Sequence, residues 1–194
     1  MKKITLLVGV LMAGLAANAA VPKQEDYYKI TRVPIPTGVV LEASGLAMLP
    51  NGKLAVSSRR GDIYTVTNPL GKADEMKLKL YASGLHEPIG IHWNDGWLYA
   101  TQRCEVTRIK DEDGDDRGDI FETVSDGWAI TGDYHEYAFG SQFDKDGNMW
   151  VVLCLTGSFN SNTPYRGWCV RVNKKGEMIP TASGIRSPGG IGLN

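Results

Sequence analysis

The sequence has 194 residues, of which 42% are hydrophobic and 23 are glycine, and its formal net charge at pH 7 is −1. A nearly neutral chain without a basic block has no electrostatic footprint for nucleic acid, which excludes that class of partner. The hydrophobic content excludes a disordered chain, and glycines spread through the sequence favour a turn-rich, all-β protein.

The N-terminus has the pattern of an export signal. Two lysines open the chain, an apolar stretch follows over residues 4–16, and a small-x-small motif ends it at residues 17–19. This pattern predicts a signal peptide over residues 1–19, cleaved after Ala19. A membrane anchor is the weaker alternative, because the apolar stretch is shorter than the roughly 20 residues that span a bilayer. We therefore expect a periplasmic or secreted protein with no membrane span.

Residues 20–41 form an N-terminal segment before the main domain, which we expect over residues 42–194. Within this segment the stretch Tyr27–Val33 alternates between polar and apolar residues like a β-strand. In a closed ring of sheets, such a strand would complete the last sheet and latch the circle. We therefore interpret it as a closing strand.

Three copies of a hairpin pattern follow in the main domain. Each has a short apolar run, an Asn-Gly or Asp-Gly turn and a second apolar run, which is the strongest local signal for a β-hairpin. The turn glycines Gly52, Gly96 and Gly147 are roughly 44 and 51 residues apart, a period typical of β-propeller blades. A fourth copy begins at Ser187 and predicts an isolated strand over residues 187–193.

Four strands are expected in each of the three blades, and turn residues separate them. The expected strands are 45–49, 53–58, 62–67 and 78–82 in the first blade, 89–93, 97–101, 105–110 and 120–124 in the second, and 138–143, 148–153, 168–173 and 177–181 in the third. The predicted fold is therefore all-β: an incomplete β-propeller of about three four-stranded blades plus the start of a fourth. Because closed propellers have about four to eight blades, we expect the N-terminal part of a larger protein.

Strand direction decides which loops share a face of such a fold. The loops after the second strands and the crossings between blades emerge together, and they carry the cationic and imidazole side chains of His86, His135, Arg59, Arg103, Arg166 and Arg186. His86 and Arg186 lie in equivalent crossings. Several such groups at one mouth of a propeller predict a site for a polyanion or an anionic cofactor, and arginines that merely solvate a surface are the alternative.

An acidic turn is expected on the opposite face. Carboxylates stand at relative positions 1, 3, 5, 9 and 12 of this turn, namely Asp111, Asp113, Asp115, Asp119 and Glu122. This is the oxygen ligand set that calcium prefers, although Asp116 stands where an EF-hand loop needs glycine. Because aspartate tolerates positive φ, we predict a calcium-stapled turn, with a solvated acidic turn as the alternative.

Three cysteines complete the inventory of reactive groups: Cys104, Cys154 and Cys169. Cys154 and Cys169 lie on two runs that should form neighbouring strands, so an exported chain could pair them. Buried free thiols are the alternative. No zinc ribbon or covalent haem motif occurs.

Two blocks carry a family resemblance, Gly84–Pro88 and Asp133–Gly140, together with the strand end at Tyr99–Arg103 and the acidic turn. They resemble exported propeller dehydrogenase-like proteins of planctomycetes and verrucomicrobia, which are related to sorbosone and soluble glucose dehydrogenases. The resemblance implies a six-bladed propeller that binds pyrroloquinoline quinone at its mouth. It also implies that His135 is the base that takes the proton of a sugar hydroxyl, while the cations of the mouth hold the cofactor.

The function expected from this resemblance is a periplasmic, quinone-dependent sugar or aldose dehydrogenase. Its substrate would be a sugar or another small molecule, and its electron acceptor a c-type cytochrome on a further part of the protein. A non-catalytic carbohydrate- or protein-binding propeller is the alternative, which Trp128 and Trp168 in loops would suit. A lactonase-type hydrolase would need an axial metal, for which Glu42 has no matched Asn or Asp in the next crossings.

Overall fold

The computed structural model describes residues 21–155 and 163–194. Residues 32–194 belong to one compact unit, and the described residues up to Thr31 belong to another, in which η1 (Gln24–Asp26) is a single 3-10 turn. The expected signal peptide lies outside the described residues. Among the described residues, no helix has the length and apolarity needed to cross a membrane.

The described part of the unit 32–194 contains three four-stranded antiparallel sheets, each built from four strands consecutive in the chain. The first sheet has β1 (Ala43–Met48), β2 (Leu54–Ser58), β3 (Ile63–Thr67) and β4 (Lys77–Ala82), with the 3-10 turn η2 (Ala73–Glu75) before β4; the second has β5 (Gly90–Asn94), β6 (Trp97–Thr101), β7 (Val106–Lys110) and β8 (Ile120–Ser125); the third has β9 (Ala138–Phe143), β10 (Met149–Leu153), β11 (Trp168–Val172) and β12 (Met178–Ser183). The predicted architecture is confirmed: these are three blades of a β-propeller.

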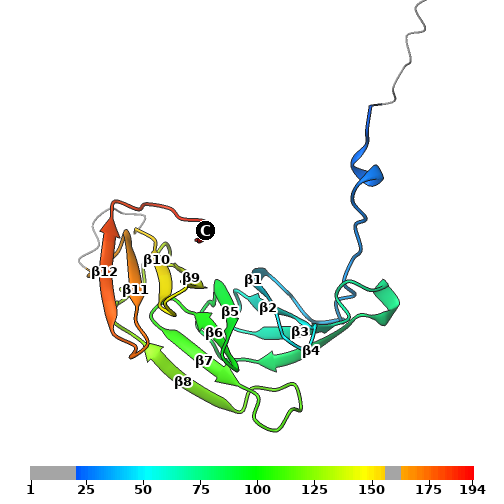
Figure 1. The fold of residues 1–194 in the computed structure, drawn as a ribbon, viewed down its shortest axis with the longest axis horizontal. Helices are drawn as coiled ribbons and strands as arrows, with labels where there is room; N and C mark the ends of the chain where they lie inside the picture. The colour runs from blue at the N-terminus through cyan, green and yellow to red at the C-terminus, as the bar shows by residue number, and fades with distance from the viewer. Residues whose placement is uncertain (1–20, 156–162) are drawn as a thin grey trace, which may run out of the picture. The chain divides into compact units, whose positions relative to one another are not determined.

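The first strands of the blades lie side by side. In Figure 1, β1, β5 and β9 follow one another at the inner side, whereas β4, β8 and β12 lie outermost. The backbones approach closely here, because a Cβ added to Gly90 would lie 2.2 Å from the carbonyl oxygen of Gly140. Hydroxyl groups also join neighbouring blades: Ser44 Oγ donates to Pro88 O at 2.6 Å, and Ser141 Oγ to Gly90 O at 3.3 Å. The inner edge of the blades is therefore tightly packed.

The hairpin turns explain why the strands begin and end where they do. Between β5 and β6 the turn is the two-residue pair Asp95-Gly96, with φ values of 46° and 82°. Positive φ at both positions is the geometry of a type I′ turn, whose twist matches that of the two flanking strands. The register Asn94↔Trp97 across this turn follows directly.

Apolar layers fill the two spaces between the blades. Ile63, Ile91 and Leu98 are at most 4% exposed and lie in the cluster that joins the first and second blades. Tyr99 and Val151 belong to the cluster that joins the second and third blades. Because each sheet is buried on the face that meets its neighbour, the described blades form a single packed body.

The outer face of the first blade has a smaller apolar cluster. It consists of Val56, Val66 and Met76, with Val33 and Leu41 from the N-terminal segment packed against it. The segment Tyr27–Val33 forms no strand among the described residues. Its role as a closing strand depends on the last blade of a closed ring and stays a prediction.

The strand expected over 187–193 was wrong. Residues 184–194 contain no strand, because no described strand offers this segment a ladder of backbone hydrogen bonds.

Candidate functional site

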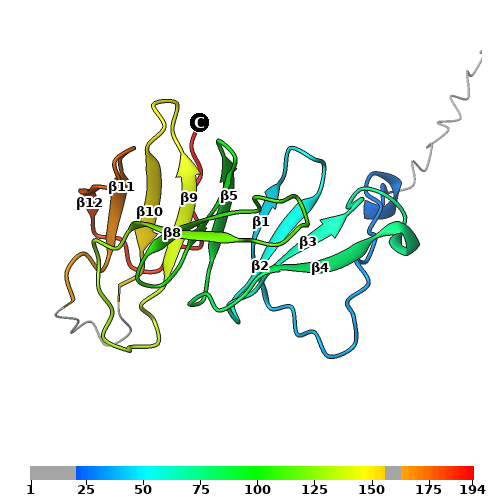
Figure 2. The same cartoon turned by 90° about the horizontal axis from the view of Figure 1, so that it is seen from below.

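Contacts between loops confirm which connections share a face. The side chain of Lys53, in the β1–β2 turn, forms an ion pair with Asp116 in the β7–β8 turn. At the other end of the strands, Arg103 follows β6 and donates to the carbonyl of Asp133, which precedes β9. Figure 2 shows the β9–β10 turn and the yellow-green segment before β9 at opposite ends of β9. We call the end that carries Arg103 and Asp133 the mouth.

A chain of ion pairs crosses the mouth. Arg59 donates to Glu87 at 2.9 Å and to Glu42 at 3.2 Å, and Glu42 also accepts from Arg60 at 3.1 Å. Glu87 in turn accepts from Arg103 at 3.1 Å. Glu42 precedes β1 and Glu87 precedes β5, so the residues just before the first strands supply the acids, and the loops after the second strands supply the arginines.

These carboxylates affect the protonation of the mouth. Glu42, then Glu87, and then the Tyr137 phenol raise the pKa of Arg59, so its guanidinium remains charged. The side chains of Arg59 and Arg60 are 48% and 57% exposed. Both cations are therefore accessible to an anion that exchanges with the carboxylates.

A hollow of about 400 Å³ lies beside these ion pairs, lined by Glu42, Arg59, Arg60, Leu85, His86 and Glu87. His86 is exposed, and its backbone is held at both ends, since its N–H donates to Gln102 and its carbonyl accepts from Arg103 N at 3.1 Å. Two of the residues that the sequence indicated, Arg59 and His86, therefore meet at one hollow.

His135 lies in the loop before β9, next to Arg103. The guanidinium of Arg103 donates to the carbonyls of Asp133 and Glu136, on either side of His135. The His135 N–H donates to Asp133 Oδ1 at 3.0 Å, and the His135 ring lies 3.8 Å from that of Tyr134, measured between centroids. No described residue hydrogen-bonds the imidazole, which is half-buried.

Glu136 is buried at the base of this loop, with 0% of its surface exposed. Its carboxylate accepts from the Thr131 N–H, from Thr131 Oγ1 at 2.9 Å, from Gly132 N at 3.2 Å and from Thr163 Oγ1 at 3.3 Å. Burial alone would raise its pKa, but the hydrogen bonds of Thr131 and Gly132 and the charge of Arg166 outweigh burial and lower it. Glu136 is thus an ionised anchor for the loop that carries His135.

Arg166 is buried near Glu136 and has a structural role. It is 6% exposed and donates to Ala129 O at 2.7 Å, Tyr137 O at 3.2 Å and Arg103 O at 3.3 Å. Burial lowers its pKa, and the nearby Glu136 opposes this effect. Since carbonyls of the neighbouring loops surround its guanidinium, Arg166 supports the mouth from beneath.

Arg186 occupies the crossing that the sequence paired with that of His86. Leu85 N donates to Gly61 O at 3.0 Å, and Ile185 N donates to Gly167 O at the same distance. The two crossings thus leave their blades in the same way. Arg186 is exposed and does not line the hollow beside Glu42, so the structure does not bring it together with Arg59 and His86.

Three acidic side chains of the β7–β8 turn gather at the opposite face. Ligand oxygens of Asp111, Asp113 and Asp115 all lie within 4.8 Å of one another. Asp116 adopts φ +65°, the conformation that the EF-hand comparison requires at that position. Glu122 lies in β8 and pairs with Arg108 at 2.7 Å, and Asp119 accepts from Glu112 N at 2.8 Å. The cluster therefore contains three of the five predicted ligands.

All three cysteines are free in the structure, and burial raises the pKa of each thiol. Sequence reasoning considered Glu42 only as a metal ligand and did not identify Glu87 and Glu136 as acids that order the mouth. Glu42 and Glu87 share a position just before a first strand, a signal that the repeat could have given, whereas the burial of Glu136 has no sequence signature.

Comparison with solved structures identifies the fold. A putative oxidoreductase (glucose dehydrogenase) of Thermus thermophilus aligns with a TM-score of 0.55 and 21% identity over 71% of this chain and 46% of that one. The chain has the same propeller fold. The PQQ-bound aldose sugar dehydrogenase of Streptomyces coelicolor aligns with a TM-score of 0.49 and 20% identity over 72% and 46% of the two chains. A catalytically inactive virginiamycin B lyase of Staphylococcus aureus, with quinupristin, aligns with 0.48 and 19% over 76% and 42%.

The chain spans less than half the length of each of these structures. No family model and no curated protein matches the sequence.

Proposed function

We propose that the protein is an exported propeller of the planctomycete and verrucomicrobial dehydrogenase-like type, and that it oxidises a sugar with pyrroloquinoline quinone. The observation that carries the proposal is the imidazole of His135, which has no described hydrogen-bond partner and stands in a loop anchored by Arg103 and Glu136. Arg103 is also paired with Glu87, which lines the hollow together with Arg59 and Arg60. The fold shared with a putative glucose dehydrogenase supports it.

The residues of the mouth fit an anionic cofactor. Arg59 and Arg60 are exposed, and both donate to carboxylates, so their guanidinium groups could donate in the same way to the carboxylates of a cofactor. His86 borders the same hollow. Arg59, Arg60 and His86 would therefore hold the quinone's carboxylates, with Arg103 behind them and Arg166 as support. Arg186, the remaining member of the cofactor set indicated by the sequence, does not line this hollow.

The reaction needs a base, and His135 supplies it. When bound, the quinone supplies the hydride acceptor. His135 accepts at an imidazole nitrogen the proton of the sugar's anomeric hydroxyl, since a neutral imidazole is a suitable base near pH 7. Arg103 positions that base by holding the carbonyls on both sides of it. We also propose a c-type cytochrome as the electron acceptor.

Calcium is proposed as a structural ligand of the β7–β8 turn. Asp111 Oδ1 accepts from Gly114 N at 2.8 Å and Asp111 Oδ2 from Asp116 N at 2.9 Å, so the turn is already folded around the carboxylates. The same turn contacts the first blade, where Gly118 N donates to Tyr81 O at 2.8 Å and Lys79 contacts the carbonyl of Asp115. A cation here would fasten the first two blades together.

A non-catalytic carbohydrate-binding propeller is the second candidate. The lactonase-type alternative loses its support, because Glu42 is paired with two arginines. Among the described residues, the one cluster able to hold a metal is that of the β7–β8 turn, away from the mouth.

Reconstitution of the full-length protein separates the candidates. The protein is loaded with calcium and pyrroloquinoline quinone and assayed with an artificial electron acceptor against a panel of aldoses. The proposal predicts quinone-dependent turnover of at least one sugar. Sugar binding by calorimetry without turnover would favour the binding propeller instead.

A further inference from the structure

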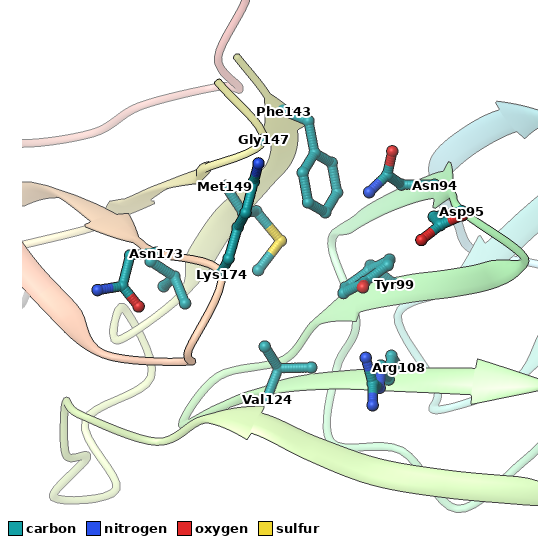
Figure 3. A pocket seen from close by; sticks show the side chains of 11 residues that line it. Asn94, Asp95, Tyr99, Arg108, Val124, Phe143, Gly147, Met149, Asn173 and Lys174 are labelled. Carbon is teal, nitrogen blue, oxygen red and sulfur yellow. The ribbon is translucent and has the colours of Figure 1, made fainter. Parts of the chain in front are cut away.

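A second cavity, of about 280 Å³, lies between the second and third blades at the end opposite to the mouth. Its lining residues are Asn94, Asp95, Tyr99, Arg108, Val124, Phe143, Gly147, Met149, Val172, Asn173 and Lys174. Figure 3 shows their side chains around the cavity, with Asn94 and Asp95 on one side and Lys174 toward the third blade. No residue of the mouth takes part, so this cavity is a separate feature of the fold.

The floor of the cavity is apolar. Met149 and Val172 are at most 2% exposed and belong to the core between the two blades. Tyr99 and Phe143 pack edge to face with 4.9 Å between their ring centroids. Such a floor can contact an apolar group of a ligand, but it offers no partner to a charged group.

Most polar groups of the wall are already used. Arg108 donates to Glu122 at 2.7 Å and stacks over the ring of Trp97, with its guanidinium carbon 4.3 Å from the centroid. The amide of Asn173 is bonded to Glu177 at 2.6 Å. Both side chains line the cavity, but their polar groups are already paired within the protein and are not available to a ligand.

Two charged groups of the wall are not used in this way. The ammonium of Lys174 and the carboxylate of Asp95 form no ion pair or hydrogen bond with any described residue. One belongs to the β11–β12 turn and the other to the β5–β6 turn. The free charges at the cavity are therefore one cation and one anion, contributed by different blades.

The local backbone holds both groups at the rim. A Cβ on Gly147 would lie 2.6 Å from Lys174 Cε, so the glycine leaves the space that the lysine stem occupies. Asp95 has φ +46° inside the tight Asp95-Gly96 turn, and this backbone conformation fixes the direction of its Cα–Cβ bond. Both charges are thus presented by short, ordered turns.

We propose that this cavity binds a free α-amino acid with an apolar side chain. The carboxylate of the ligand pairs with Lys174, its ammonium pairs with Asp95, and its side chain packs on Met149 and Val124. A simple carboxylate pairs with Lys174 alone, a simple amine pairs with Asp95 alone and a neutral sugar pairs with neither, so a zwitterion is the ligand that forms both ion pairs. The volume is just below the range of about 300–1,000 Å³ for ligand pockets, as suits a small ligand.

Calorimetric titration of the full-length protein with L-leucine tests the proposal. Two analogues each lack one charge: 4-methylpentanoate lacks the ammonium and 3-methylbutylamine lacks the carboxylate. We expect saturable binding of leucine and at least about tenfold weaker binding of either analogue, a difference of about 1.4 kcal/mol. Absence of leucine binding, or equal affinity for 4-methylpentanoate, would overturn the zwitterion site.

Three variants assign the binding to the cavity. Lys174→Met and Asp95→Asn should each weaken leucine binding about tenfold. Both side chains are exposed, and asparagine tolerates positive φ, so circular dichroism should show an unchanged fold. Lys145→Met, in the neighbouring β9–β10 turn, should bind like the parent protein. Equal affinity of all three variants, or binding of D-glucose that depends on Lys174 and Asp95, would also contradict the proposal.

Discussion

Glu87 and Arg103, joined by an ion pair of 3.1 Å, connect the crossing into the second blade with the loop that carries His135. Glu87 also pairs with Arg59 of the first blade, and Arg103 also bonds the carbonyls on either side of His135. The mouth of the three described blades is therefore one connected polar network. Its geometry depends on carboxylates that stand before the first strands.

Glu136→Gln should destabilise the protein by about 2–3 kcal/mol, because the amide brings donors toward the N–H groups of Thr131 and Gly132 and removes the charge beside buried Arg166. Urea unfolding gives the difference. Glu112→Gln, on an exposed side chain, should stay within about 0.5 kcal/mol of the parent protein. Equal loss in both variants would show that Glu136 is no anchor.

Asp144 should contribute stability that disappears in acid. Hydrogen bonds from Asn148 and Trp150 lower its pKa to about 2, below the unfolded value of about 3.9. A depressed folded pKa gives stability above pH 4 or so that is lost as the pH falls through about 2. The melting-temperature difference between parent and Asp144→Asn should therefore shrink from pH 7 to pH 2, whereas Asp146→Asn should show no such trend.

Gly90→Ala should cost about 2–3 kcal/mol, because the new methyl group would meet the backbone carbonyl of Gly140 in the neighbouring blade. Gly189→Ala is the matched control, since a Cβ there meets no atom within 4 Å. Thermal unfolding of the two variants gives the comparison. A neutral Gly90→Ala would mean that the inner strands lie further apart than described.

The acidic turn should make stability depend on calcium. We expect the parent protein to melt at a higher temperature in calcium than in chelator, since a ligand that binds only the folded state stabilises it. The double variant Asp113→Ala/Asp115→Ala should melt alike in both, while Asp74→Ala keeps the difference. Superimposable melting curves of the parent protein would remove the site.

The strands could be predicted because each strand is determined by residues close to it in the sequence. Asn-Gly and Asp-Gly turns fix the first hairpin of each blade, and all twelve strands lie within two residues of their expected ends. The strand expected over 187–193 failed for the opposite reason, because a strand exists only with a partner that a local pattern does not supply.

The candidate site was less predictable than the fold. His86, His135 and Arg59 could be assigned to one face from strand direction alone. Whether an arginine is exposed or buried depends on packing between distant loops, so Arg59 and Arg166 looked alike in the sequence although only Arg59 is accessible. Likewise, the spacing of the acidic turn indicated Glu122 as a ligand, but its cross-strand neighbour Arg108 pairs with it.

The central claim is that His135 is the base of a quinone-dependent sugar oxidation, and the most direct test is kcat of His135→Gln in the reconstituted full-length protein. We expect kcat to fall by about 10²–10⁴-fold, the contribution typical of a general base, while the affinity for pyrroloquinoline quinone stays within about twofold. Tyr134→Phe, next to it in the loop, should keep kcat. An unchanged kcat in His135→Gln would contradict the account.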